Sequence, residues 1–425
     1  MKTKLTITDI EKNFKTIYGN DENVIDNQKK RYASLIRNYY ENFNVSEKTW
    51  ILSTPGRTEL SGNHTDHNGG KVIAASINLD TLIMFSGEEN YIKLKSDKYN
   101  ETFIVDISDL EIKEEEKGTT KSIIRGILSG FKKNGFKVGG FSGYLVSDVI
   151  QGSGLSSSAS VEVAIGSVIN FLYNDNTISP EVISKIGQFA ENEYFGKPCG
   201  LMDQVACASG GIVTIDFKDN ENPKIVNIAF DLEEFDYKLL VVDTGGTHQN
   251  LTDEYAAIPF EMKQIANYFG KVKCAELNYE EVLKSIYELR QKFSDRAILR
   301  VIHFLQENLR VEEQVNALIK KDFRKFIDLV KNSGNSSYKY LQNVYSSKNV
   351  NEQPLSLALA ITENFLMDVN EGACRIHGGG FAGTIQVFIP NKYVEDYIKI
   401  IEKIFGKNSV SVLSIRQSGS FVLNF

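Results

Sequence analysis

The segment from Gly152 to Ser160, Gly-Ser-Gly-Leu-Ser-Ser-Ser-Ala-Ser, has the residue types of an anion site. It follows the predicted strand Gly143–Val149 and precedes the apolar-periodic run Val161–Ile169. A helix that begins after a glycine turn offers unpaired backbone N–H groups and partial positive charge, which favour phosphate. The serines add hydroxyls for a phosphate or a magnesium ion. A Walker A ending is absent, and a plain serine N-cap remains the alternative for this segment alone.

A second segment, from Pro55 to Gly70, is dense in polar side chains. It reads Pro-Gly-Arg-Thr-Glu-Leu-Ser-Gly-Asn-His-Thr-Asp-His-Asn-Gly-Gly. So many donors and acceptors suit a sugar or another polyol, because each hydroxyl group needs a partner. Two alternatives are a metal site formed by His64, Asp66 and His67 and a polar loop without a ligand. A zinc site would need a further ligand, which argues against the metal.

Two more features complete the set of chemically suggestive residues. The run Gly378-Gly-Gly-Phe-Ala-Gly383 holds four glycines in six positions directly before the predicted strand Thr384–Ile389. A loop that keeps so many glycines needs positive φ angles or a close approach of its backbone to a neighbour. The other feature is Asp203 in Cys199-Gly-Leu-Met-Asp-Gln204. Taken alone, such an aspartate is more often a cap or turn residue than a base.

Hydrophobic periodicity predicts the elements that position these segments. Short β-type runs fill the stretch from Trp50 to about Val149, and strands return between Gly210 and Val242. Helices are expected over Ser122–Lys133, after Gly152–Ser158, over Pro180–Tyr194 and through most of Asp253–Asp368. Strands mixed with segregated helices favour the α+β class over a doubly wound sheet. We expect an N-terminal lobe over residues 1–225, a C-terminal lobe over residues 226–425 and an active-site cleft between them.

The composition excludes several classes of protein. Hydrophobic residues make up 42% and charged residues 24% of the 425 residues, which is typical of a globular protein rather than a disordered one. The net charge of −7 predicts neither nucleic acid nor a membrane surface as a partner. Four cysteines without a Cys-x-x-Cys pair, no apolar leader and no membrane-length apolar run predict a cytoplasmic protein with reduced thiols. The oligomeric state is not predicted.

Taken in order, these segments resemble the motifs of the galactokinase branch of the GHMP small-molecule kinases. The resemblance extends from about Trp50 to the C-terminus. It implies a two-lobed α+β GHMP kinase, with an N-terminal lobe like the second domain of ribosomal protein S5 and a ferredoxin-like C-terminal lobe with extra helices. It also implies that ATP, Mg²⁺ and a sugar bind between the lobes. The implied reaction is phosphorylation of the anomeric 1-hydroxyl of galactose or a close galactose-type sugar.

The resemblance further implies roles for individual residues. Arg57 and Asp203 match the catalytic arginine and aspartate, and Ser157 and Glu191 match the magnesium-binding pair. Asp203 would accept the proton of the 1-hydroxyl, while Arg57 would neutralise charge on the phosphate. The sugar-contacting positions are Asn63, His64, Asp66, Gly200, Asp203 and Tyr255. The ATP- and phosphate-binding loop comprises Gly152, Ser153, Gly154, Leu155, Ser156, Ser157 and Ser158.

Some positions depart from the family pattern, whose sugar signature reads roughly Gly-Arg-Val-Asn-Leu-Ile-Gly-Glu-His-Thr-Asp-Tyr-Asn. Here Glu59 replaces Asn, Asn63 replaces Glu and His67 replaces Tyr. Outside the signature, residues 119–126 lack the aromatic residues often found near adenine. His377 stands where Thr or Ser is usual, and Ala382 where Gly is usual.

The change at position 63 leaves the sugar open. A glutamate there pairs with a sugar 6-hydroxyl and repels a 6-carboxylate, whereas Asn63 can accept from the former or donate to the latter. Galactose is therefore the first expected substrate, and galacturonate or another galactose derivative is the alternative. Two further alternatives are a kinase for another alcohol, such as mevalonate or homoserine, and a non-catalytic paralogue that senses sugar and ATP.

Overall fold

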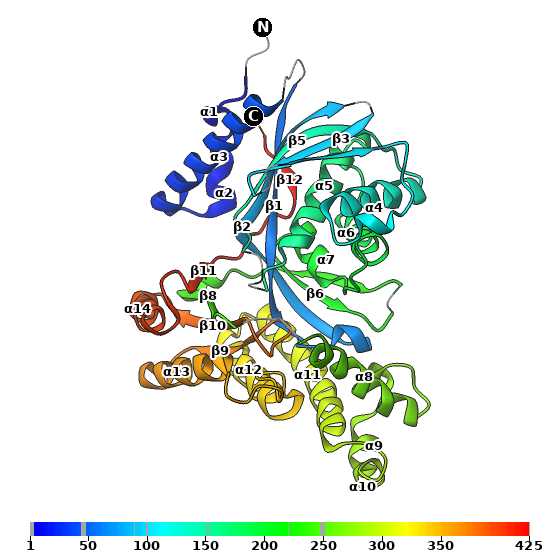
Figure 1. Ribbon diagram of the computed structural model, residues 1–425. Coiled ribbons are helices and arrows are strands. Elements are labelled where there is room, and N and C mark those ends of the chain that lie inside the picture. Colours follow the sequence, from blue (N-terminus) through cyan, green and yellow to red (C-terminus); the bar gives the residue numbers. More distant parts are fainter. Residues whose placement is uncertain are drawn as a thin grey trace.

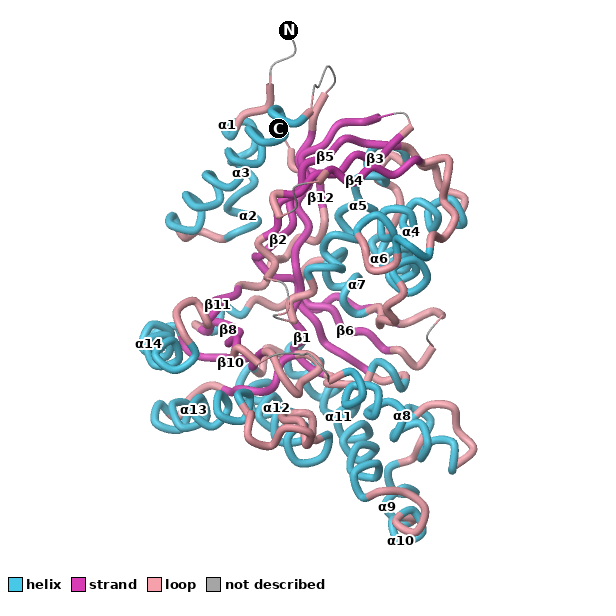
Figure 2. Tube along the Cα trace, in the orientation of Figure 1, coloured by secondary structure: helices cyan, strands magenta, loops and turns pink. Residues whose placement is uncertain are grey.

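The computed structural model describes residues 4–43, 48–88, 90–98, 101–150, 152, 154–219, 221–246 and 251–424. Ser153 of the expected phosphate-binding loop lies outside these residues. Two β-sheets, one in each lobe, organise the chain (Figure 1). Figure 2 shows the strands along the middle of the molecule with helices around them. The predicted α+β class is therefore confirmed.

An eight-stranded sheet forms the first lobe, and its two long strands carry the polar signature. β1 (Trp50–Ser61) pairs antiparallel with β2 (Lys71–Glu88), with a register shift between Pro55 and Arg57. Residues 55–61 of the signature are therefore strand rather than loop. The sheet order is β12-β1-β2-β5-β3-β4, with β6 and β7 beside the other end of β2. The remaining strands are β3 (Tyr91–Ser96), β4 (Thr102–Asp106), β5 (Gly140–Ser147), β6 (Ile212–Asp216), β7 (Lys224–Ile228) and β12 (Phe421–Val422).

Alternate side chains of this sheet face two different helix layers, as the two-residue repeat of a strand requires. Leu52 and Ile83 belong to a core formed with α4 (Thr120–Lys133), α5 (Ser157–Tyr173), α6 (Pro180–Phe189) and α7 (Met202–Ser209). Their neighbours Ile51 and Leu82 pack instead with the N-terminal helices α1 (Ile7–Ile10), α2 (Phe14–Tyr18) and α3 (Glu22–Asn42). Both faces of the central strands are therefore buried.

The second lobe contains a four-stranded antiparallel sheet of order β11-β8-β10-β9. Its strands are β8 (Tyr237–Asp243), β9 (Ala373–His377), β10 (Thr384–Pro390) and β11 (Val410–Leu413). A helical region separates β8 from β9, and one helix separates β10 from β11, which is the β-α-β-β-α-β connectivity of ferredoxin-like domains. The helices are α8 (Thr252–Tyr268), α9 (Tyr279–Lys284), α10 (Ile286–Leu289), α11 (Asp295–Ile319), α12 (Phe323–Ser336), α13 (Pro354–Val369) and α14 (Val394–Phe405).

The end of the chain returns from the second lobe to the first. β12 pairs with β1, and the wholly buried Arg416 donates to the Ser53 hydroxyl over 2.7 Å. Asp80 accepts from Arg416 over 3.3 Å and from Tyr18 over 2.7 Å, so one buried carboxylate ties both chain ends to β2. The expected division at residue 225 falls inside β7, and the first lobe also includes the C-terminal strand. Position along the sequence alone does not separate the lobes.

The four cysteines are free thiols, and three of them, Cys207, Cys274 and Cys374, are buried. None of the helices in the described part combines the length and the apolar character that a membrane span requires.

Candidate active site

The glycine- and serine-rich segment connects β5 to α5 through a left-handed turn. Gly152, Gly154 and Ser156 have φ angles of 79°, 74° and 57°, and α5 begins at Ser157. Glycine adopts such angles without steric cost, which explains two of the three positions. The described part of this segment thus has the strand–turn–helix arrangement that can receive an anion at the helix N-terminus.

Arg57 and Asp203 form a two-point ion pair beside this turn. Arg57 Nε donates to Asp203 Oδ1 over 2.7 Å, and Nη2 donates to Oδ2 over 2.6 Å. Burial by itself lowers the pKa of Arg57, but the charge and the hydrogen bonds of Asp203, together with smaller contributions from Cys207 and Glu59, raise it above its ordinary value. Arg57 also donates through Nη1 to the carbonyl of Gly154, and the Ser156 hydroxyl donates to Asp203 Oδ2. β1, the turn and α7 therefore meet at one carboxylate.

A cavity of about 550 Å³ opens next to this ion pair. Its polar lining includes Arg57, Asp203, Glu191 and Lys197 together with the turn before α5. Its lining also includes the apolar side chains of Leu94, Phe103, Ile123, Leu145 and Phe195. A lining that combines charged and apolar side chains suits a ligand that has both a phosphate and a flat ring.

Glu191 lies in a π-helical turn, Ala190–Phe195, directly after α6. Its Oε1 accepts from Lys197 Nζ over 3.2 Å, and its Oε2 accepts from the Gln204 amide over 3.2 Å. The same amide donates to Glu162 over 2.9 Å, and burial together with repulsion by Glu191 raises the pKa of Glu162 well above its ordinary value. Glu162 Oε1 is buried without a hydrogen-bond partner within the described ranges.

These oxygens fit a hard cation. Mg²⁺ is usually held by one or two protein oxygens together with substrate phosphates rather than by a cage of protein ligands. Ser157 and Glu191 line the same cavity, and Ser157 is the first residue of α5. The described residues contain no cluster of three or more His, Cys, Asp or Glu side chains that could hold a metal. That finding goes against the metal alternative for His64, Asp66 and His67.

Three of the predicted sugar-contacting residues, Asn63, His64 and Tyr255, contact the third glycine segment, which is the hairpin between β9 and β10. His64 Nε2 lies 2.7 Å from the Gly379 carbonyl oxygen, and the Tyr255 hydroxyl donates to the Gly380 carbonyl over 2.6 Å. Burial lowers the pKa of His64 to about 4, so its imidazole is neutral at pH 7. At Gly200 a β-carbon would lie 2.6 Å from Asp66 Oδ2, so any other residue there would displace this carboxylate.

Asn63 is completely buried, and its amide is occupied by protein groups. Nδ2 donates to the Gly378 carbonyl over 2.6 Å and to Glu59 Oε1 over 3.3 Å, while Oδ1 accepts from Asn343 over 2.7 Å. Glu59 in turn pairs with Arg375 over 2.7 Å. Asn63 and Glu59, two of the departures from the family signature, are thus in contact. Asn63 supports the glycine hairpin through its hydrogen bond to the Gly378 carbonyl. Because its side chain is buried, Asn63 presents no exposed amide that could distinguish a hydroxyl from a carboxylate at the sugar 6-position.

Several residues of the site carry no local sequence signal. Phe103 on β4 and Phe195 line the cavity, although the stretch of residues 119–126 lacks aromatic residues. His377 bridges Thr58 over 3.0 Å and Thr384 over 2.9 Å, and a β-carbon at Gly154 would lie 3.1 Å from His377 Nδ1. The third segment therefore contacts the turn before α5 through His377. In the sequence, the one signal for His377 is that it stands where Thr or Ser is usual in the family.

Comparisons with known proteins agree with this arrangement. The family model of the GHMP kinases N terminal domain matches residues 121–211, and that of the galactokinase galactose-binding signature matches residues 37–86. A galactokinase of Pyrococcus furiosus is 33% identical over 278 residues, which cover 64% of this chain and 73% of the relative. A galactokinase of Glaesserella parasuis is 29% identical over 376 residues, 87% of this chain and 93% of the relative.

Solved structures share the fold. Lactococcus lactis galactokinase complexed with galactose gives a TM-score of 0.76 at 22% identity, covering 91% of this chain and 98% of that chain. A mevalonate kinase of L. major in complex with R-mevalonate gives a TM-score of 0.58 at 15% identity, covering 88% and 97% of the two chains. The two-lobed architecture is therefore the GHMP kinase fold. With the signatures at residues 37–86 and 121–211 and the extended similarity to the Pyrococcus furiosus protein, the chain belongs to the galactokinase family of the GHMP kinases.

Proposed function

We propose that this protein is a sugar 1-kinase that transfers the γ-phosphoryl group of ATP to the 1-hydroxyl of galactose, giving galactose 1-phosphate and ADP. The observation that carries the proposal is the position of the Arg57–Asp203 ion pair. The pair contacts the turn that begins α5 through Gly154 and Ser156, and Asp203 lies three residues after Gly200, where a β-carbon would meet Asp66. An acceptor for a hydroxyl proton therefore stands next to a site for phosphate.

Phosphoryl transfer depends mainly on in-line positioning and on neutralising the charge of the transferred group. Asp203 is the proton acceptor, because its two oxygens retain lone pairs beyond those that Arg57 and Ser156 use. Arg57 holds that carboxylate in place and supplies positive charge at the junction. Backbone N–H groups at the start of α5 bind the phosphates. In this role Gly152–Ser158 is the phosphate-binding loop.

Ser157 and Glu191 are the residues that would hold Mg²⁺. The ion would neutralise charge on the β- and γ-phosphates of the bound nucleotide. Glu191 is 3% exposed and is held by Lys197 and Gln204, so its carboxylate is already oriented. Phe103 and Phe195, which also line the cavity, provide flat apolar surface on which we place the adenine.

The sugar is proposed to bind between Asp203 and the glycine hairpin. His64, Asp66, Gly200 and Tyr255 are its contacts, and the neutral imidazole of His64 can serve as donor or acceptor. Asn63 contributes as a positioning residue, because it holds the hairpin through Gly378. Galactose is preferred to galacturonate because the relatives described above, which match most of this chain, are galactokinases.

Measuring sugar-dependent ADP release tests the proposal directly. The panel comprises galactose, N-acetylgalactosamine, galacturonate and glucose, with mevalonate and homoserine for the other alcohols that GHMP kinases phosphorylate. Galactose is expected to give the highest kcat/KM. Release of ADP with galacturonate but not with galactose would overturn the choice of sugar. Binding of galactose and ATP without any ADP release would instead identify a sensing paralogue, although Arg57, Ser157, Glu191 and Asp203 are all present.

A further inference from the structure

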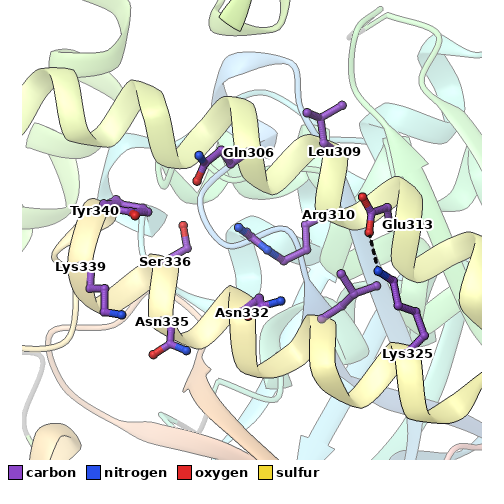
Figure 3. Close-up of a pocket in the computed structure, with 11 residues that line it drawn as sticks. Gln306, Leu309, Arg310, Glu313, Lys325, Asn332, Asn335, Ser336, Lys339 and Tyr340 are labelled. Carbon is purple, nitrogen blue, oxygen red and sulfur yellow. Dashed lines mark ion pairs between the residues drawn. The ribbon is translucent and has the colours of Figure 1, made fainter. Parts of the chain in front are cut away.

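A groove between α11 and α12 has no part in the site described above. It encloses about 450 Å³, within the range of roughly 300–1,000 Å³ typical of small-molecule sites. Figure 3 shows the guanidinium of Arg310 between the two helices, near Gln306 of α11 and Ser336 of α12. The other polar side chains used in the argument are Asn332, Asn335 and Lys339.

The charge of this groove is positive at one end. At the opposite end Lys325 pairs with Glu313 over 3.1 Å, so these two charges compensate each other (Figure 3). Lys339 makes no ion pair with any described residue. Arg310 donates through Nη1 to Glu307, and its remaining N–H groups have no hydrogen-bond partner within the described ranges. Arg310 and Lys339 thus present donors to an anion, and the three carboxamides nearby suit hydroxyl groups.

The floor of the groove is connected to the sugar signature. Glu307 is wholly buried beneath Arg310, and its Oε1 accepts from the backbone N–H of Gly62 over 3.3 Å. On the other wall, Ser336 lies 2.8 Å from His303 Nδ1, and His303 Nε2 lies 3.0 Å from the carbonyl oxygen of Asn63. Two buried hydrogen-bonded paths therefore run from the groove to the two residues that precede His64.

We propose that this groove is a regulatory site for a small phosphate monoester of a polyol, and that its occupancy weakens sugar binding. A phosphate dianion bound to Arg310 competes with Glu307 for the same guanidinium. Glu307 then loses part of the positive charge that stabilises it while it holds Gly62. The turn from Gly62 to His64 becomes less firmly fixed, and the sugar contacts of His64 and Asp66 weaken. The coupling rests on the proposed sugar site, whereas binding in the groove does not.

The test is a calorimetric titration with glucose 6-phosphate as the probe. The protein is first saturated with ADP, Mg²⁺ and galactose, so that the phosphate-binding loop and the sugar site are filled. We expect binding of one probe molecule with a Kd of about 1 mM or tighter. In the reverse experiment, saturating probe is expected to weaken galactose binding by about fivefold. Absence of probe binding overturns the proposal, and so does binding that leaves the galactose Kd unchanged.

Variants locate the probe. Lys339→Gln changes an exposed side chain and is expected to weaken probe binding by about tenfold. The Kd for galactose of the probe-free protein is expected to stay unchanged. Arg310→Gln is expected to abolish probe binding. The matched control Lys320→Gln, at the end of α11 and outside the groove, is expected to bind the probe as the wild type does. Wild-type probe binding by Lys339→Gln overturns the proposal even if Arg310→Gln fails to fold.

Two further comparisons separate the possible explanations. Inorganic phosphate lacks the hydroxyl groups and is expected to bind at least about tenfold more weakly than the probe. Equal binding of the two overturns the assignment to a polyol ester. Binding of the probe without any measurable heat of galactose binding would contradict the proposed function. The groove would then be an anion site without the proposed coupling to the sugar site.

Discussion

Arg57 on β1 holds Asp203 on α7 through hydrogen bonds of 2.7 Å and 2.6 Å, although the two residues are 146 positions apart in the chain. A two-point contact between a guanidinium and a carboxylate fixes both the distance and the plane of the acceptor. The Ser156 hydroxyl adds a third donor from the turn before α5. The orientation of the proposed proton acceptor therefore depends on three segments of the first lobe.

Asp203→Asn removes the acceptor with almost no change of shape. Because positioned general bases contribute about 10²- to 10⁴-fold to a rate, we expect kcat to fall by about 100-fold or more. The measurement is steady-state ADP release at saturating galactose and ATP. Asp26→Asn, at an exposed position on α3, serves as the control and should retain the wild-type rate. A kcat of Asp203→Asn within about threefold of the wild type would show that Asp203 is not the base.

Gly200→Ala tests the close approach of Asp66 to the backbone. The new β-carbon would lie 2.6 Å from Asp66 Oδ2, so the carboxylate must move. We expect KM for the sugar to rise by about tenfold, equivalent to about 1.4 kcal/mol, with KM for ATP nearly unchanged. Asp66→Ala supplies the matched background, since the clash is absent there. If Gly200→Ala raises KM by the same factor in both backgrounds, the contact with Asp66 is not the cause.

Asn63→Glu tests the buried support of the glycine hairpin. The substitution removes the donor to the Gly378 carbonyl and places a second carboxylate beside Glu59. We expect the free energy of unfolding to fall by about 2–4 kcal/mol, as measured by urea denaturation. The exchange Glu59→Asn with Asn63→Glu leaves a single carboxylate in the pair and should recover part of the loss. Wild-type stability of Asn63→Glu would contradict this account.

The stability of the protein should depend on the ionisation of Glu307. Burial by itself raises the pKa of this carboxyl group, but Arg310, His303 and Arg375 outweigh burial and lower it from 4.5 to about 2. A lowered pKa means that the carboxylate stabilises the folded state above about pH 4.5, and that this stability is lost as the pH falls toward 2. The contribution is about 3 kcal/mol.

Glu307→Gln is therefore expected to unfold at lower urea concentration at pH 7 and to lose less stability than the wild type between pH 5 and about 3. The measurement is urea unfolding as a function of pH. Glu281→Gln, at an exposed position on α9, should follow the wild-type curve. Parallel curves for the wild type and Glu307→Gln would show that Glu307 has no such role.

Local residue patterns determined much of this protein. The glycines at 152 and 154 and the serines that follow predicted a turn into a helix, because positive φ angles and helix N-termini depend on nearby residues. Short β-type runs between Trp50 and about Val149 predicted strands for the same reason. The resemblance in motif order then placed Arg57, Asp203 and Glu191 in one site before any contact was known.

Contacts between distant segments were decided only by the tertiary structure. β9 (Ala373–His377) was not predicted, because a short strand buried at every position has no alternating pattern. The sequence placed Asn63 at a sugar-contacting position, whereas packing against Gly378 and Asn343 buries it completely. The connection of Glu307 to Gly62 spans 245 positions and has no counterpart in any motif. Such contacts depend on which buried polar groups meet when the lobes pack, and residue spacing along the chain does not record that.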